Sequence, residues 1–93
     1  MREEIITRLE KIENVNAIIN GFTYRIKMYQ SLIPDLKRAG LYGLADKFDN
    51  RIDTCARAIS RLTIYKNKIW QQLIMNIGGR ELADSILIYM III

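Results

Sequence analysis

Apolar side chains recur along the first third of the chain at alternating steps of three and four residues. The average step is about 3.5 residues, the period at which helices pack along one another in a coiled coil. This first series comprises Ile12, Val15, Ile19, Phe22, Ile26, Tyr29 and Ile33. A second series, interrupted only by Lys66, comprises Phe48, Ile52, Cys55, Ile59, Leu62, Ile69 and Leu73. The pattern predicts two long helices that share an apolar seam.

The first helix is bounded by a proline. Pro34 has no backbone donor and disfavours a helical residue before it, so we expect this helix over about residues 2–32, ending or kinking sharply near Leu32. The dipeptide Asn20-Gly21 is a common turn signal. A turn would reset the phase of the apolar series, and the phase continues, so the sequence favours a continuous helix there.

Glycines bound the elements that follow. Residues 33–43 are expected to form a hinge, in which Pro34 starts one helical turn and Gly40 ends it. The second helix is expected over about residues 44–77, before Gly78-Gly79, and a C-terminal segment covers residues 80–93. The predicted fold is therefore all-α and forms a single domain over residues 1–93. It is a long antiparallel helical hairpin with a short C-terminal helix, assembling into a four-helix or larger bundle.

The C-terminal run of residues 86–93 is apolar and uncharged, and an exposed copy would aggregate. Three arrangements would bury this run: folding back on the hairpin as a third helix, packing against or exchanging with another subunit, or inserting into a membrane interface. The last is the least favoured, because the run has no basic polar face. The residues expected to carry self-association are Ile19, Phe22, Ile26, Ile52, Ile59, Leu62, Ile69, Ile88, Ile91, Ile92 and Ile93.

Two polar residues belong to the apolar seam or adjoin it. Lys66 occupies the slot between Leu62 and Ile69, and Asn16 neighbours the seam of the first helix. A polar residue in a helical seam usually selects one alignment of the helices over others, at some cost in stability. We interpret both residues in this way, in preference to ligand-binding groups.

Composition argues against an enzyme. The 93 residues include no histidine, the commonest general acid or base and the commonest metal ligand. Helical spacing places most of the carboxylates on solvated faces, and Gly78-Gly79 lacks the lysine of a phosphate-binding loop. No cofactor or metal is therefore expected. The carboxylates considered are Glu3, Glu4, Glu10, Glu13, Asp46, Asp49 and Asp53.

The net charge of +4 makes nucleic acid the alternative partner. A row of cations on the second helix could follow phosphates, although three aspartates border the same face and Asp53 is placed to pair with Arg57. The residues expected to contact phosphates under this alternative are Lys37, Arg38, Arg57, Arg61 and Lys68.

The single cysteine, the charged start of the chain and the residue composition bear on compartment and origin. Cys55, the one cysteine, lies in phase with the second apolar series and is predicted to be a small buried apolar residue. The charged start of the chain does not resemble a signal peptide, and no apolar run is long enough for a membrane span, so a cytoplasmic or intravirion setting is expected. The isoleucine- and tyrosine-rich, histidine-free composition resembles that of small helical proteins of archaeal viruses and plasmids, a likeness that covers no motif.

Together these features predict a non-enzymatic small helical scaffold or adaptor protein. It would act as a homo-oligomer that binds a further protein partner, with viral or plasmid origin suggested by composition. The alternative is a small basic DNA- or RNA-binding protein that contacts phosphates through the outer face of its second helix.

Overall fold

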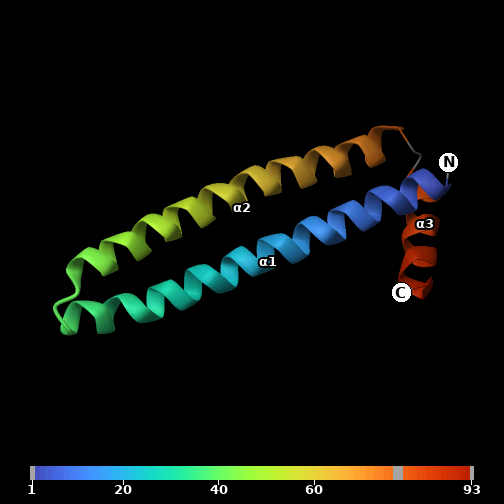
Figure 1. The fold of residues 1–93 in the computed structure, drawn as a ribbon. Helices are drawn as coiled ribbons and strands as arrows, with labels where there is room; N and C mark the ends of the chain where they lie inside the picture. The colour runs from blue at the N-terminus through green and yellow to red at the C-terminus, as the bar shows by residue number, and fades with distance from the viewer. Residues whose placement is uncertain (1, 77–78, 93) are drawn as a thin grey trace. The chain divides into compact units, whose positions relative to one another are not determined.

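The computed structural model describes residues 2–76 and 79–92, and helices make up nearly all of this part of the chain. Helix α1 spans Arg2–Arg38, α2 spans Tyr42–Asn76 and α3 spans Gly79–Ile92 (Figure 1). The two long helices pack together, and no strand occurs among the described residues. The predicted all-α hairpin with a short C-terminal helix is therefore confirmed.

Helix α1 departs from its predicted boundary at one end. It passes through Asn20-Gly21 without a break, as the phase of the seam indicated, but it also continues through Pro34 to Arg38. The boundary predicted near Leu32 is wrong. A proline at position 34 removes one hydrogen bond, to the carbonyl of Gln30, while its fixed φ remains compatible with a helix. Continuing the helix keeps Ile33 buried on the seam, which offsets part of that loss.

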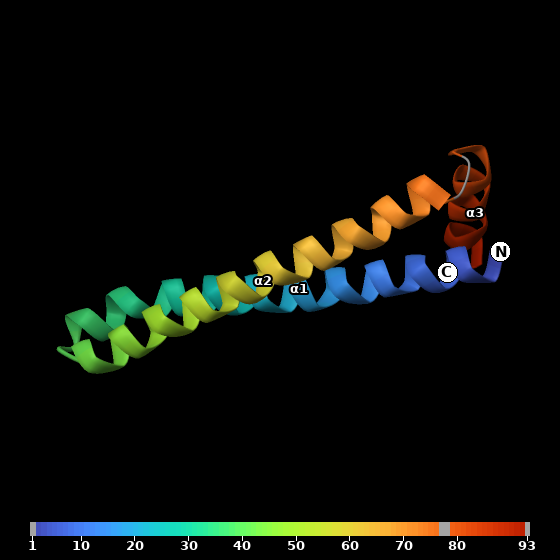
Figure 2. The ribbon, with the colours of Figure 1, turned by 90° about the horizontal axis from the view of Figure 1, so that it is seen from above.

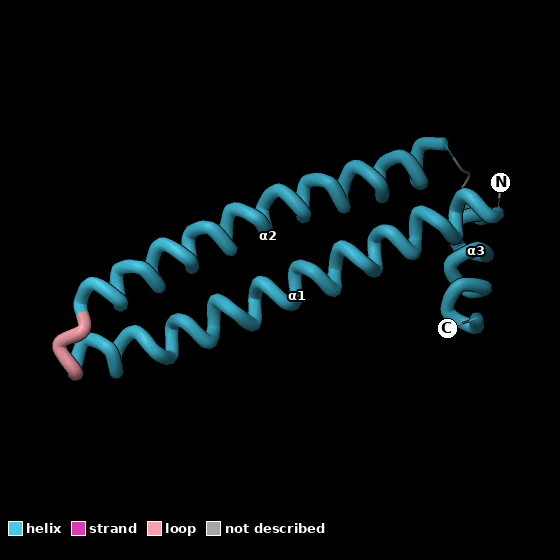
Figure 3. The backbone as a smooth tube through the Cα atoms, viewed as in Figure 1, coloured by secondary structure: helices cyan, strands magenta, loops and turns pink. Residues whose placement is uncertain are grey.

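A three-residue turn connects α1 to α2, drawn as the pink loop in Figure 3. The amide of Leu41 donates to the carbonyl of Leu36 at 2.8 Å, and the amide of Gly40 donates to the carbonyl of Lys37 at 3.0 Å. These two bonds form a Schellman cap, which requires a left-handed residue, and Gly40 has φ +79°. The sequence correctly identified Gly40 as the helix end, but the connection is much shorter than the predicted hinge of residues 33–43.

The chain divides into two compact units. Unit 1 holds the described parts of residues 1–17 and 64–93, so it contains the start of α1, the end of α2 and all of α3. Unit 2 is Ile18–Thr63, which contains the remainder of the two long helices and the turn between them. Unit 1 therefore has three helices to build a core, whereas unit 2 has two.

The core of unit 1 is closed. Ile5 and Leu73 are 0% exposed, and Leu82 of α3 packs into the same cluster. Trp70, Ile86 and Tyr89 are half-buried against it. The cluster consists of Ile5, Leu9, Ile12, Ile69, Leu73 and Leu82. Part of the C-terminal run is thus covered as in the first of the three predicted arrangements, because Ile86 and Tyr89 of α3 pack on this cluster. Leu87, Met90 and Ile91 of the same run are 60%, 70% and 82% exposed.

Candidate functional site: the open seam of unit 2

The apolar seam of unit 2 is only partly covered. Each of its two helices packs against the other alone, and no third segment of residues 18–63 lies over them. Only Ile33, Ala45 and Cys55 are buried in this unit. The half-buried seam residues, here called the open seam, are Ile19, Phe22, Ile26, Tyr29, Phe48, Ile52, Ile59 and Leu62. Every one of them belongs to the periodic series, which therefore correctly identified residues that are partly buried in this unit.

Aromatic rings and an arginine hold the open seam together near the turn. The ring centroids of Tyr29 and Phe48 are 5.1 Å apart, with the planes tilted by 44°. The guanidinium of Arg51 lies 5.5 Å from the centroid of Phe48 and 6.0 Å from that of Tyr29. Such contacts each contribute about 0.5–1 kcal/mol at an exposed site. They fix the register of α1 against α2 within unit 2.

A shallow hollow opens on α1 farther from the turn. It is lined by Ile18, Gly21, Phe22 and Arg25, and the Arg25 guanidinium lies 5.5 Å from the ring centroid of Phe22. A Cβ placed on Gly21 would meet no atom within 4 Å. Ile18 is 50% exposed beside it. The missing side chain at position 21 therefore leaves apolar surface of the open seam accessible from outside.

A polar pair connects the two long helices within unit 1. The Nζ of Lys66 donates a hydrogen bond to the Oδ1 of Asn16 at 3.1 Å. The sequence identified each residue separately as a polar group of the seam, and the structure brings the two together. Since either residue would lose its partner if α2 slid by one turn, the pair favours a single alignment of the helices.

The basic residues are distributed unequally between the units. Unit 2 contains eight Lys and Arg against four Asp and Glu, whereas unit 1 contains six of each, so the whole net charge of +4 belongs to unit 2. Sequence reasoning did not find this asymmetry, because it depends on which distant segments fold together. It did locate the basic row of α2.

The five predicted phosphate contacts fall in different surroundings. Arg57 and Arg61 lie together and line an open hollow with Thr54 and Ala58. Arg38 forms a salt bridge with Asp35. Lys37 is exposed in the last turn of α1, and Lys68 is exposed on the part of α2 that belongs to unit 1.

The hydrogen-bond acceptor of Arg57 differs from the Asp53 carboxylate that the sequence predicted. Its Nε donates to the backbone carbonyl of Asp53 at 3.4 Å, rather than to the carboxylate. Among the described residues, the salt bridge between Arg38 and Asp35 is the one formed. The cations of the Arg57 and Arg61 hollow are therefore not neutralised by a salt bridge within the described chain.

The residues predicted for self-association are also divided between the units. Ile19, Phe22, Ile26, Ile52, Ile59 and Leu62 belong to the open seam of unit 2. Ile69 is buried in the closed core of unit 1, while on α3 Ile88 is half-buried and Ile91 is 82% exposed. Ile92 ends α3 but its side chain lies outside the described part, as does Ile93.

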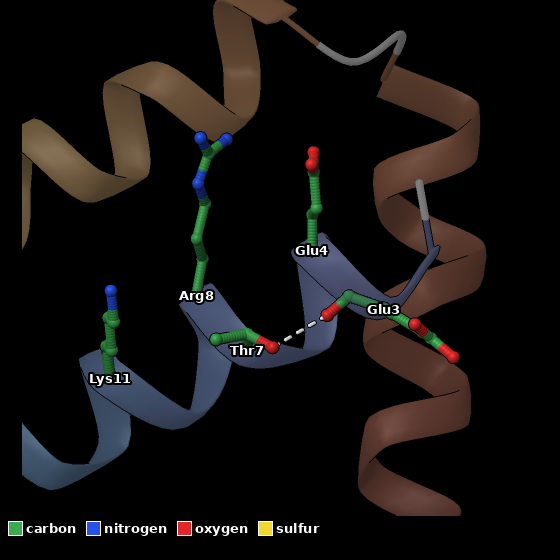
Figure 4. A pocket seen from close by; sticks show the side chains of 5 residues that line it. All are labelled: Glu3, Glu4, Thr7, Arg8 and Lys11. Atoms are coloured by element: carbon green, nitrogen blue, oxygen red, sulfur yellow. Dashed lines mark hydrogen bonds between the residues drawn. The ribbon is translucent and has the colours of Figure 1, made fainter.

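A cluster of metal-ligating side chains is absent from the described residues. The seven carboxylates considered from the sequence are all exposed, and no group of three or more His, Cys, Asp and Glu within residues 2–76 and 79–92 could hold a metal ion. A third hollow, on the first turns of α1, is lined by Glu3, Glu4, Thr7, Arg8 and Lys11 (Figure 4). There Thr7 donates its hydroxyl to the carbonyl of Glu3 at 2.9 Å, and Glu4, Arg8 and Lys11 extend from the same side of α1.

None of the helices in the described ranges is both long and apolar enough to cross a bilayer.

Comparison with protein family models, curated proteins and solved structures found no match.

Proposed function

We propose that this protein is a small, non-enzymatic helical scaffold that self-associates through the open seam of unit 2. The observation that carries the proposal is the contrast between the two units. In unit 1 the apolar series is buried in the cluster that α3 joins, whereas in unit 2 most of the same kind of series is only partly buried along both helices. Burying that surface against further helices would stabilise the chain by about 25 cal/mol for each Å² removed from water.

Chemical features of the described residues are in keeping with an interaction role. Carboxylates are exposed and separate, and the hollows are shallow and open to solvent on single helices. A small-molecule site usually requires an enclosed pocket with convergent polar groups. A partly buried apolar series along two helices instead suits a further helix, which would pack its own apolar stripe against it.

Light scattering across a concentration series tests this proposal. We expect an oligomer at micromolar concentration, and we expect Ile52→Ala with Ile59→Ala to weaken association by roughly 10- to 100-fold while circular dichroism stays helical. Ile64→Ala with Ile74→Ala is the matched control, because these isoleucines are exposed on α2 outside unit 2. A wild-type chain that stays monomeric at high micromolar concentration would contradict the proposal.

Nucleic-acid binding is the second candidate, favoured by the concentration of the net charge in unit 2 and by the Arg57 and Arg61 hollow. If it is correct, duplex or single-stranded nucleic acid should shift in a gel at about 50 mM salt, and Arg57→Gln with Arg61→Gln should weaken the shift. Arg38→Gln is the control, since Arg38 already pairs with Asp35. Absence of any shift at that salt concentration would exclude phosphate-driven binding.

A further inference from the structure

Helix α1 carries a second apolar series beside the seam in unit 2. Its members follow one another at alternating steps of four and three residues, and Arg25 is the one charged member. Ile18 and Leu32 are 50% and 39% exposed, so neither is buried against α2. Phe22 and Tyr29 belong to both series, which makes this surface continuous with the open seam. The members are Ile18, Phe22, Arg25, Tyr29, Leu32 and Leu36.

The facing part of α2 has no comparable surface. Within residues 18–63, α2 is the one helix that lies along α1 (Figure 2). On α2 every large apolar side chain from residue 45 to residue 63 is buried or half-buried, and seven charged side chains are exposed. On α1, residues 14–34 include only two charged side chains, those of Arg25 and Lys27. A wide apolar stripe is typical of a helix with more than one neighbour, so a further helix would pack on α1.

The hollow beside Gly21 has the form that receives a side chain from a facing helix. Its four lining residues stand at positions i, i+3, i+4 and i+7, which are neighbours on a helix surface and form the hole of knobs-into-holes packing. Gly21 leaves this hollow open, because a Cβ there would meet no atom within 4 Å. The guanidinium of Arg25 lies at its edge, 5.5 Å from the centroid of the Phe22 ring. The hollow, here called the α1 hollow, is therefore an apolar recess with one cation beside it.

Helix α3 presents an apolar stripe that unit 1 does not cover. This α3 stripe consists of Leu87, Met90 and Ile91, which are 60%, 70% and 82% exposed. It lies on a different face of α3 from the residues that pack on the core cluster. Asp84 is exposed and lies three residues before Leu87, at the edge of the same face. Since residues 85–93 carry no charged side chain, and a helix that is apolar all round is normally buried, the α3 stripe requires a covering surface.

We propose that the α3 stripe of one copy of this chain packs on the α1 hollow of another copy, with the two helices antiparallel. When Leu87 enters the hollow, Asp84 lies about 4.5 Å from it along α3, opposite Arg25, which is about 5 Å from the centre of the hollow along α1. In the other direction Ile91 lies about 6 Å from Leu87 and meets Ile18. The contact therefore joins apolar groups to apolar groups and a carboxylate to a guanidinium.

Charge selects this orientation. In the parallel alternative Asp84 would lie opposite Ile18, and Ile91 would lie opposite Arg25, which leaves a carboxylate and a cation without partners at the interface. Arg25 forms no salt bridge within the described residues, and no carboxylate occurs in residues 14–34 of its own helix. The Asp84 carboxylate of a second copy would supply the missing negative charge.

One chain carries both of the surfaces that meet. It has the α1 hollow with its cation and the α3 stripe with its carboxylate, so two copies match each other without any further protein. Because the two surfaces differ, the contact is heterologous and each copy can use both. This inference rests on the proposed self-association and names the segments through which the copies touch.

Two single-cysteine variants test the contact. In a Cys55→Ala background, Gly21→Cys places a thiol in the α1 hollow and Leu87→Cys places one on the α3 stripe. An equimolar mixture under mild oxidation should yield a 21–87 disulfide, identified by mass spectrometry, because these positions face each other. Each chain carries one thiol, so this disulfide forms only between copies. Gly43→Cys is the matched control and should form little disulfide with Leu87→Cys, since a Cβ at Gly43 also meets no atom within 4 Å but lies outside the hollow.

The outcomes separate this contact from self-association itself. A 21–87 disulfide above its random share of the products supports the contact. Random shares, or an excess of 21–21 or 87–87 disulfides, overturn it, because the unlike surfaces would then have no preference for each other. Absence of all three disulfides, in a chain that light scattering shows to be oligomeric, also overturns it and leaves the open seam as the interface. A one-chain mass at high micromolar concentration overturns self-association and this contact together.

A charge exchange tests the alignment without any thiol. Arg25→Glu and Asp84→Lys each place like charges together, so each should weaken association roughly tenfold. The two substitutions in one chain restore an opposite pair and should recover most of the association. Lys27→Glu makes the same change of charge outside the hollow and is the control, for which we expect a smaller effect. A double variant that associates no better than the two single losses combined would overturn the pairing of Arg25 with Asp84.

Discussion

Leu73→Ala should lower the free energy of unfolding of unit 1 by about 2–5 kcal/mol. Leu73 is 0% exposed and lies in the cluster to which all three helices contribute, so truncation removes apolar contact and leaves a cavity. A domain of this size has a total stability of roughly 5–15 kcal/mol, of which this loss is a large share. Trp70, the only tryptophan, packs against the same cluster, so its fluorescence in a denaturant titration reports on unit 1.

Ile74→Ala is the control for this prediction. Ile74 is the next residue along α2 but is 63% exposed, so its truncation should change stability by about 0.5 kcal/mol or less. The comparison also tests how α2 is rotated, because adjacent residues point about 100° apart on a helix. Equal effects of the two substitutions would mean that the closed core of unit 1 is lined by a different face of α2.

Tyr89 should lose its proton at a much higher pH than an ordinary tyrosine does. Its hydroxyl donates a hydrogen bond to the Glu13 carboxylate. That bond, with partial burial and the negative charges of Glu13 and Glu10, raises the pKa of Tyr89 from 10.0 to about 12. The difference between the near-ultraviolet titrations of the wild type and Tyr89→Phe isolates this phenol. We expect its midpoint near pH 12.

The free energy of unfolding should depend on pH because of this raised pKa. The folded state holds the Tyr89 proton more tightly than the unfolded state does. The contribution of protonated Tyr89 to the free energy of unfolding is therefore complete below pH 10 and is lost as the pH rises through about 12. Tyr89→Phe should lack this loss, seen as a smaller fall in unfolding free energy over that range. Glu13→Gln should move the midpoint back toward 10, because it removes the carboxylate. A midpoint already near 10 in the wild type would show that α3 does not bring Tyr89 to Glu13 in solution.

The sequence predicted helices and facing residues well, because one physical signal governs both. The alternating steps of three and four identified the open seam residues and the continuous helix through Asn20-Gly21, since a break would have changed the phase. The boundary near Leu32 was wrong because the rule for proline is local. It does not include the burial of Ile33, which depends on the second helix.

The candidate site was harder to predict from the sequence, because it depends on which distant segments pack against one another. No local pattern shows that α3 packs on the start of α1 and the end of α2 within unit 1. The bond between Lys66 and Asn16 crosses 50 positions of sequence. Arg57 and Arg61 were identified as a basic row, but the confinement of the net positive charge to residues 18–63 was not, because it depends on which segments form one compact unit.

The turn at Gly40 has a topological consequence. Among the described residues, Gly40 alone has positive φ, and helix lies within two residues on either side of it. If that position took right-handed helical geometry, the chain would not reverse there, and the seam residues that now pack within one hairpin would have to pack against another molecule. One backbone angle therefore separates a chain that folds on itself from one that exchanges its halves with a neighbour.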